Sequence, residues 1–141
     1  MSAVSATDAP PTILVVDDEP ALLRLMEFVL QKQGYAMITA TNGDEALEML
    51  NAHHPDLVVL DIMMPRRDGY QVAEAIRANP ALAATPIVML SAKAQEEDVE
   101  RGMSVGVNIF ITKPFAPENL TRVVAALLAG ETVPQKMGSE N

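Results

Sequence analysis

Cysteine and tryptophan are absent from this chain of 141 residues, and aromatic residues make up only 4% of it. The absence of cysteine excludes disulfide bonds and thiolate metal sites, and it fits a reducing, cytoplasmic compartment. Because hydrophobic residues still make up 49% of the chain, the core must be built from aliphatic side chains and methionine. The length predicts one compact domain.

Long apolar runs and basic residues are also scarce. No run approaches the roughly 20 residues that a membrane-spanning helix requires, and the start, MSAVSATDAPPT, lacks the pattern of a signal peptide. Lys and Arg number 10 against 19 Asp and Glu, which gives a formal charge of −9. This charge argues against direct nucleic-acid binding and is compatible with cations and basic protein partners. We therefore expect neither a membrane nor a nucleic acid as a partner.

The two ends of the chain differ in composition from the middle. Residues 1–11 and 131–141 are small, polar and proline-containing, and they predict disordered tails around a domain at 12–130. Within that domain, short apolar runs alternate with segments of helical periodicity. Several runs are continuously apolar, which is typical of parallel strands covered on both faces. The predicted strands are 12–16, 35–40, 56–60, 86–90 and 107–112.

The segments between these runs carry helix signals. The first helix is predicted to begin at Pro20, with one apolar face formed by Leu22, Leu25, Met26 and Val29. Capping-box spacing marks the starts of the second and third helices, at Asn42 with Glu45 and at Asp68 with Gln71. The last helix ends at Gly130, and its apolar face comprises Leu120, Val123, Val124, Leu127 and Leu128.

The fourth helix has a weaker pattern. Only Val99 and Met103 form an apolar stripe, and Gly102 lowers the helix propensity of its middle. We expect it to pack thinly and to be a candidate for a mobile element, because conformational switching draws on segments of low stability.

Five successive strand–helix units predict an α/β fold with a doubly wound parallel sheet and five helices. In such sheets the functional groups gather beyond the carboxyl ends of the strands. Four of the five predicted strands end in a charged or hydroxyl residue, which is hard to attribute to helix capping alone. These residues are Asp17, Asp18 and Glu19 after the first strand, Asp61 after the third, Ser91 after the fourth, and Thr112 and Lys113 after the fifth.

The chemistry of these residues indicates a cation and a phosphoryl group. Converging carboxylates repel each other unless a cation neutralises them, and Mg²⁺ suits oxygen ligands while leaving room for phosphate oxygens. Zinc is disfavoured because cysteine and a histidine cluster are missing. Lys113 and Ser91 offer a positive charge and a hydroxyl donor to phosphoryl oxygens.

At this point a resemblance to a known family becomes apparent. The stretches ILVVDDEP, DLVVLDIMMPRRDGYQ, PIVMLSAKAQEED and FITKPF resemble the motifs of the receiver domain of two-component response regulators, in order and over residues 12–130. The resemblance implies a CheY-like, flavodoxin-like fold with strand order 2-1-3-4-5. It also implies a phosphorylatable signalling switch rather than a turnover enzyme.

The resemblance assigns roles by position. Asp61 matches the residue that accepts a phosphoryl group from a phosphohistidine. Asp17 and Asp18, with Asp61 and the main-chain carbonyl of Met63, match the Mg²⁺ ligands. Ser91 and Lys113 match the residues that contact the phosphoryl group, and the Lys113–Pro114 bond matches a cis peptide. Ser91 also acts as a switch residue in the family, together with an aromatic residue that Phe110 matches.

Partners follow from the same resemblance. The phosphoryl donor is expected to be a sensor histidine kinase or a histidine phosphotransfer protein. A downstream protein target is expected on the face of the fourth helix, the fifth strand and the last helix. Arg66 and Arg67 depart from the small or apolar residues common in the family, and we interpret them as groups that attract anionic donors or alter the lifetime of the acyl phosphate.

Two other functions compete with this interpretation. A Mg²⁺-dependent phosphohydrolase with an Asp nucleophile commonly needs a second acid two residues later, where this chain has Met63. An FMN-binding flavodoxin needs a Ser/Thr/Gly-rich phosphate loop after the first strand, where this chain has DDEP.

Overall fold

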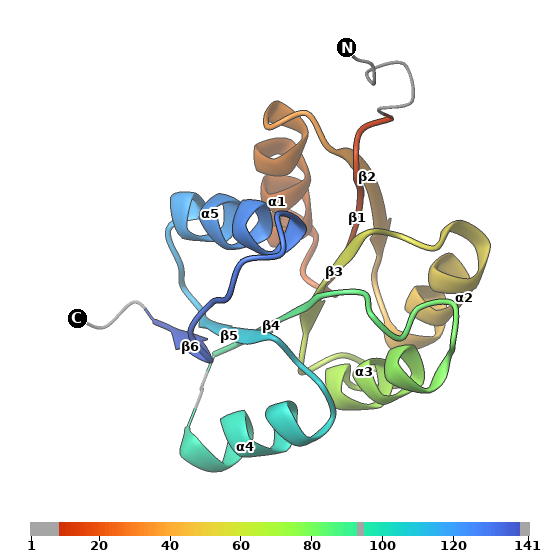
Figure 1. The fold of residues 1–141 in the computed structure, drawn as a ribbon, viewed down its shortest axis with the longest axis vertical. Coiled ribbons are helices and arrows are strands. Elements are labelled where there is room, and N and C mark those ends of the chain that lie inside the picture. The colour runs from red at the N-terminus through yellow and green to blue at the C-terminus, as the bar shows by residue number, and fades with distance from the viewer. Residues whose placement is uncertain (1–8, 93–94, 139–141) are drawn as a thin grey trace.

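The computed structural model describes residues 9–92 and 95–138, and within them the chain forms six strands and five helices (Figure 1). The strands are β1 (Thr12–Val16), β2 (Ala36–Ala40), β3 (Leu57–Asp61), β4 (Ile87–Ser91), β5 (Ile109–Thr112) and β6 (Lys136–Met137). The helices are α1 (Pro20–Lys32), α2 (Gly43–His53), α3 (Gly69–Ala78), α4 (Glu96–Ser104) and α5 (Pro117–Leu128). None of these helices is long and apolar enough to cross a membrane.

All strand pairs are parallel, in the order β2-β1-β3-β4-β5-β6. The predicted doubly wound sheet and its five-strand order are therefore confirmed, with a sixth strand added at the edge. Helices α1 and α5 cover one face, and α2, α3 and α4 cover the other (Figure 1).

Side chains alternate between two cores along each central strand, as expected for a sheet buried on both faces. In β1, Ile13 and Val15 join the core beneath α1 and α5, while Leu14 and Val16 join the core beneath α2 and α3. All four are fully buried. The continuous apolar runs thus fill two cores, and the polar residues Asp17, Asp61 and Ser91 stand at the carboxyl ends of the central strands.

The buried face of α1 differs from the predicted one. The residues buried in the core are Leu23, Met26 and Leu30, whereas Leu25 is 44% exposed and Phe28 is 59% exposed. The helix is apolar at more positions than one face can hold, so several stripes of helical spacing fit its sequence. Packing against the sheet and α5 decides which of them is buried.

Both predicted capping pairs are formed, with one change of partner. At α3, the Asp68 carboxylate accepts from the Gln71 N–H, and the Gln71 side chain accepts from the Asp68 N–H, both at 3.0 Å. At α2, Asn42 accepts from the Glu45 N–H at 2.8 Å. The Glu45 carboxylate accepts instead from the N–H of Thr41, one residue earlier than the reciprocal box requires.

Helix α4 packs thinly, as predicted: Gly102 is its only buried residue, and Val99 and Met103 are partly buried. Gly102 has a role that helix propensity does not reveal. A Cβ atom built on it would lie 2.2 Å from the ring of Phe110, which is fully buried in β5. The missing side chain therefore allows α4 to lie directly on this ring.

We predict that Gly102→Ala destabilises the protein by about 1–3 kcal/mol, because the added methyl group overpacks the contact with Phe110. Helix propensity alone predicts that Gly102→Ala stabilises the protein, since alanine in place of glycine at an open helix position stabilises a helix by about 1 kcal/mol. Urea unfolding of this variant against Glu100→Ala, an exposed change on the same helix, measures the difference. A gain in stability on Gly102→Ala would show that α4 shifts freely away from the ring.

The prediction of a disordered tail at 131–141 is wrong for the part after α5 that the structure describes, because this part contains a strand. Within residues 131–138, Lys136 and Met137 form β6 at the edge of the sheet. Residues 139–141 lie outside the described part, and so do residues 1–8, which make up most of the tail predicted at 1–11. The physical reason is the edge of β5, whose backbone groups need partners. The Phe110 N–H donates to the Gln135 carbonyl at 2.8 Å, and Val133 and Met137 pack against the core.

Candidate functional site

The carboxyl edge of the sheet brings together residues from three strand ends. Asp17 follows β1 and is fully buried, Asp61 ends β3 and is 5% exposed, and Lys113 follows β5. The Lys113 ammonium lies 3.1 Å from Asp17 Oδ2 and 3.3 Å from Asp61 Oδ1. Two buried carboxylates thus share one cation, which leaves the group with a net negative charge.

The geometry shifts the pKa of both Asp61 and Lys113. Burial is the main reason why the pKa of Asp61 is raised above its ordinary value of 3.8, and the negative charge of Asp17 adds to it. The attraction of Lys113 offsets only part of this increase. For Lys113, burial alone would lower the pKa, but the two carboxylates outweigh it and raise the pKa above 10.5.

The third carboxylate, that of Asp18, is exposed, and it completes a cluster able to hold a metal ion. One oxygen from each of Asp17, Asp18 and Asp61 lies within 4.8 Å of the others. Three hard oxygen donors, with an open side toward solvent at Asp18, suit Mg²⁺ with several retained waters. Asp17 is held in place because its Oδ1 accepts from the Glu19 N–H at 2.9 Å.

The remaining predicted site residues lie around this cluster. Ser91 ends β4 and is 8% exposed, and its carbonyl accepts from the Lys113 N–H at 2.7 Å. The Met63 side chain is 76% exposed, and the role of its main-chain carbonyl as a metal ligand stays a prediction. The Lys113–Pro114 bond is cis. Phe110 lies deeper in the sheet, where it pairs with Met89 of β4, and its ring lies against Gly102 of α4.

Sequence reasoning missed two glycines that shape the loop after Asp61. A Cβ atom on Gly69 would lie 2.7 Å from the Asp61 carbonyl oxygen and 2.9 Å from Met89 Sδ. A Cβ atom on Gly43 would lie 2.2 Å from the Arg67 carbonyl oxygen. The last residues of the loop therefore lie close to both the end of β3 and the start of α2. A glycine at the first position of each of two helices was the available signal.

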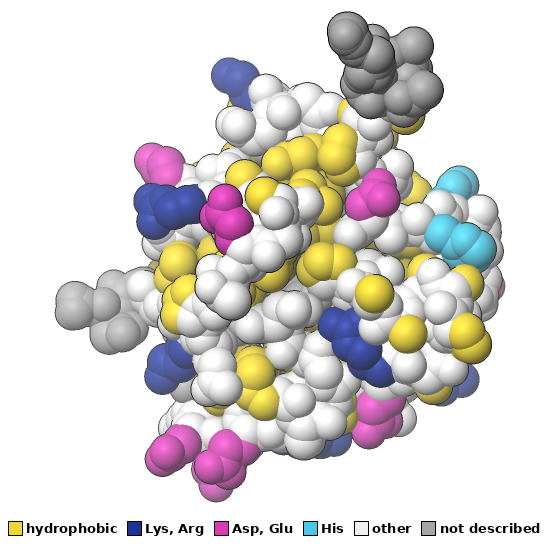
Figure 2. Space-filling model, in the orientation of Figure 1, with side chains coloured by type: hydrophobic (Ala, Val, Ile, Leu, Met, Phe, Trp, Pro, Cys, Tyr) yellow, Lys and Arg dark blue, Asp and Glu magenta, His cyan; other side chains and the backbone are white. Residues whose placement is uncertain are grey.

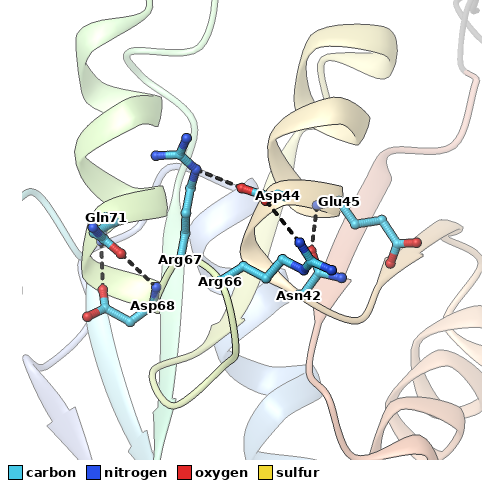
Figure 3. A network of polar contacts seen from close by, with 7 residues as sticks. All are labelled: Asn42, Asp44, Glu45, Arg66, Arg67, Asp68 and Gln71. Atoms are coloured by element: carbon cyan, nitrogen blue, oxygen red, sulfur yellow. Dashed lines mark hydrogen bonds and ion pairs between the residues drawn. The ribbon is translucent and has the colours of Figure 1, made fainter.

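Arg66 and Arg67 belong to this loop (Figure 3). Arg67 Nε donates to Asp44 Oδ1 of α2 at 2.8 Å, and Arg66 Nη1 lies 3.9 Å from Asp44 Oδ2. Arg66 has φ +75°, in the left-handed region that favours glycine. Both side chains are more than half exposed, so each ion pair contributes at most about 1 kcal/mol. Their effect on phosphodonors stays a prediction.

A cavity of about 440 Å³ lies between the start of α3 and α4, beside the cluster; its lining includes Met63, Ser91, Tyr70 and Arg101. The Tyr70 hydroxyl donates to the Asp98 carbonyl at 3.2 Å, and the Arg101 guanidinium lies over the Tyr70 ring at 4.1 Å. Tyr70 therefore links α3 to the thinly packed α4 at the wall of the site. No motif in the sequence pointed to this link.

The fold and the site define a class of α/β domains, with a parallel sheet that carries an acidic cluster and a lysine at its carboxyl edge. Comparison with known proteins identifies the family. The model of the response regulator receiver domain matches residues 13–125. The chain belongs to this family, and is a regulatory domain of two-component signalling.

Several relatives are similar over most of this chain. The alkaline phosphatase synthesis transcriptional regulatory protein PhoP of Bacillus subtilis is 41% identical over 116 residues, which are 82% of this chain and 48% of PhoP. Protein PilG of Pseudomonas aeruginosa is 40% identical over 114 residues, or 81% of this chain and 84% of PilG. The chain thus spans about half the length of PhoP and of several other curated relatives it matches.

Among solved structures, the chemotaxis response regulator CheY4 of Vibrio cholerae superposes with a TM-score of 0.80. It is 30% identical, and the match covers 84% of this chain and 98% of that one. The receiver domain of the Francisella response regulator 1452 gives a TM-score of 0.79 at 30% identity, over 85% of this chain and 98% of that one.

Proposed function

We propose that this chain is a phosphorylatable switch that accepts a phosphoryl group on Asp61 and thereby alters its contacts with other proteins. The observation that supports this most directly is the placement of Lys113 between Asp17 and Asp61 at the acidic cluster. A lone buried carboxylate at a strand end costs stability, whereas one that sits beside a lysine and a cation site is arranged for phosphoryl chemistry.

The chemical step uses few protein groups. An Asp61 carboxylate oxygen forms a bond to phosphorus while the bond from phosphorus to the donor's leaving atom breaks; that atom is an imidazole nitrogen in a phosphohistidine. Asp17, Asp18 and Asp61, with the Met63 carbonyl, would hold Mg²⁺, which when bound offsets the negative charge of the phosphoryl oxygens. Lys113 supplies a second positive charge, and the Ser91 hydroxyl donates to a phosphoryl oxygen in the product.

The donor and the target follow from the family. A sensor histidine kinase or a histidine phosphotransfer protein supplies the phosphoryl group, and the face of α4, β5 and α5 contacts the downstream protein. In this proposal the Phe110 ring and α4 rearrange together after phosphorylation, because they are in direct contact and α4 is weakly held to the sheet. Turnover of phosphate esters is not part of this function.

Incubation with Mg²⁺ and a small acyl phosphate, followed by intact-mass measurement, tests the proposal. We expect one phosphoryl adduct per chain, and we expect a chelator to suppress it because the three carboxylates then repel the donor. An adduct of the same yield with chelator would contradict the metal assignment. Steady release of inorganic phosphate from phosphate esters, without an adduct, would favour the phosphohydrolase instead.

A further inference from the structure

The outer edge of β5 is covered by the chain itself. After α5 the C-terminal segment, residues 131–138, returns and runs parallel to β5, where Phe110 pairs with Lys136 and Ile111 with Met137 (Figure 1). The Phe110 N–H donates to the Gln135 carbonyl at 2.8 Å. This short strand satisfies backbone groups that an edge strand otherwise leaves open to pairing with another chain.

Side chains add two further contacts to this backbone pairing. Val133 and Met137 are partly buried against the core beneath α1 and α5. On the other side, Gln135 borders a groove of about 280 Å³ whose other lining residues, Glu96, Val99, Glu100 and Met103, all come from α4. The segment therefore occupies a surface made of one strand edge and one helix flank.

The C-terminal segment is held weakly. Only two of its residues pair with β5, a length too short to be stable by itself. Glu131, Thr132, Pro134, Gln135 and Lys136 are exposed, and the neighbouring α4 contributes one buried residue to the core. Segments with few buried contacts open at low free energy, so a competing strand can replace this one.

We propose that the outer edge of β5 with the adjoining flank of α4 is a strand-binding surface that Val133–Met137 occupy in cis, and that an extended segment of a partner protein binds there by displacing them. Backbone hydrogen bonds supply affinity in this mode of binding, and side-chain pockets supply specificity. The chain's own segment indicates what the partner segment must contain. Like Val133 and Met137, it should carry two apolar side chains four residues apart.

Charge further describes the partner segment. Helix α4 begins with Glu96, Glu97 and Asp98, and Figure 2 shows acidic side chains gathered at the lower left of the molecule, over α4. Lys136 of the C-terminal segment pairs with Phe110 of β5, and the ring of Phe110 lies against Gly102 of this acidic helix. A partner segment with a basic residue between its two apolar ones fits this surface best.

The surface also contacts the predicted switch residue. The backbone of Phe110 pairs with the C-terminal segment, while its ring lies against Gly102 of α4. A change in the position of this ring therefore alters both walls of the strand-binding surface. This link to signalling rests on the proposed function, but the occupancy of the surface does not.

Hydrogen exchange of the Phe110 amide in the full chain tests the proposal. Val133→Ser/Met137→Ser removes the two apolar contacts of the C-terminal segment. In this variant we expect the Phe110 amide to exchange at least roughly tenfold faster than in wild type. The amides of β1 and β3 should keep their protection. The matched control, Glu131→Gln/Thr132→Ser, changes two exposed residues that precede Val133–Met137 and should leave exchange unchanged. A synthetic peptide of residues 130–138 should bind the double variant and restore the protection, and bind the wild type at least roughly tenfold more weakly.

Two results would overturn the inference. Unchanged exchange at Phe110 in Val133→Ser/Met137→Ser would mean that the C-terminal segment is not held by these contacts. Loss of protection that the peptide does not restore, or equal peptide binding to wild type and variant, would mean that the edge is no strand-binding surface occupied in cis. None of these measurements involves phosphorylation, so failure of the Asp61 chemistry leaves them interpretable.

Discussion

Asp61→Asn is expected to abolish the phosphoryl adduct, with at least about a 100-fold loss relative to wild type, because the amide cannot act as the nucleophile. Asparagine has nearly the same shape, so the surrounding strand end and Lys113 need not move. The measurement is intact mass after incubation with Mg²⁺ and an acyl phosphate.

The control for this variant is Asp56→Asn. Asp56 is exposed at the opposite end of β3, where its carboxylate accepts from the Thr12 N–H at 2.7 Å, a bond that an amide oxygen can keep. We expect the control to form the adduct as wild type does. An adduct that persists in Asp61→Asn would place the phosphoryl group on another residue and refute the proposed function.

Asp61→Asn is also expected to change the stability of the metal-free protein, measured in the presence of a chelator, and this change depends on pH. The pKa of Asp61 is raised in the folded protein above 3.8, so the ionised carboxylate destabilises the fold at pH values above its folded pKa. Asp61→Asn should therefore unfold at higher urea concentration than wild type at neutral pH. The difference should shrink as the pH falls through the folded pKa and vanish below about 3.8. A difference that grows toward low pH would contradict the raised pKa.

Lys113→Ala is expected to destabilise the metal-free protein by about 2–3 kcal/mol. The ammonium pairs with two buried carboxylates, and its removal leaves both charges uncompensated. The side chain of Lys113 is 19% exposed, so the expected loss is below that of a fully buried pair. Because its pKa is raised above 10.5, the contribution is complete at neutral pH and is lost only in strongly alkaline solution.

Addition of Mg²⁺ should recover part of the stability of Lys113→Ala, since a cation at the acidic cluster neutralises the same carboxylates. Urea unfolding with and without Mg²⁺ measures this recovery. Lys32→Ala removes an equal charge from the exposed end of α1 and serves as the control. If Mg²⁺ stabilised the two variants equally, the ion would not bind at the carboxylates that Lys113 contacts.

The features of the fold that the sequence predicted best are those that depend on short stretches of the chain. The five apolar runs predicted the central strands to within a residue or two, because strands buried on both faces need continuous apolar sequence. Asp68 with Gln71 predicted the start of α3, since a capping box involves only residues three apart. The polar residues at the strand ends predicted the cluster of Asp17, Asp61 and Lys113, because parallel strands bring their carboxyl ends to one edge.

The buried face of α1 depends on how the helix packs and could not be read from its sequence. Its sequence, PALLRLMEFVLQK, allows several apolar stripes, and the position of the helix over β1 and beside α5 selects Leu23, Met26 and Leu30. The tertiary structure likewise decided that a short polar segment after Gly130 forms β6. A strand of two residues has no periodicity to detect, and it exists because the edge of β5 offers backbone partners.

The close approaches between elements were also beyond the sequence. Gly43, Gly69 and Gly102 look like weak helix residues, yet each stands where another segment comes too near for a side chain. Arg77 is similar: its guanidinium donates to the carbonyls of Ala83, Thr85 and Gly106 and to Asn108 Oδ1. The strands and the helix caps could be predicted because they depend on neighbours along the chain. The residues of the acidic site could be predicted because parallel strands place their carboxyl ends at one edge of the sheet. The buried faces, the sixth strand and the contacts of these glycines depend on segments that meet only after folding.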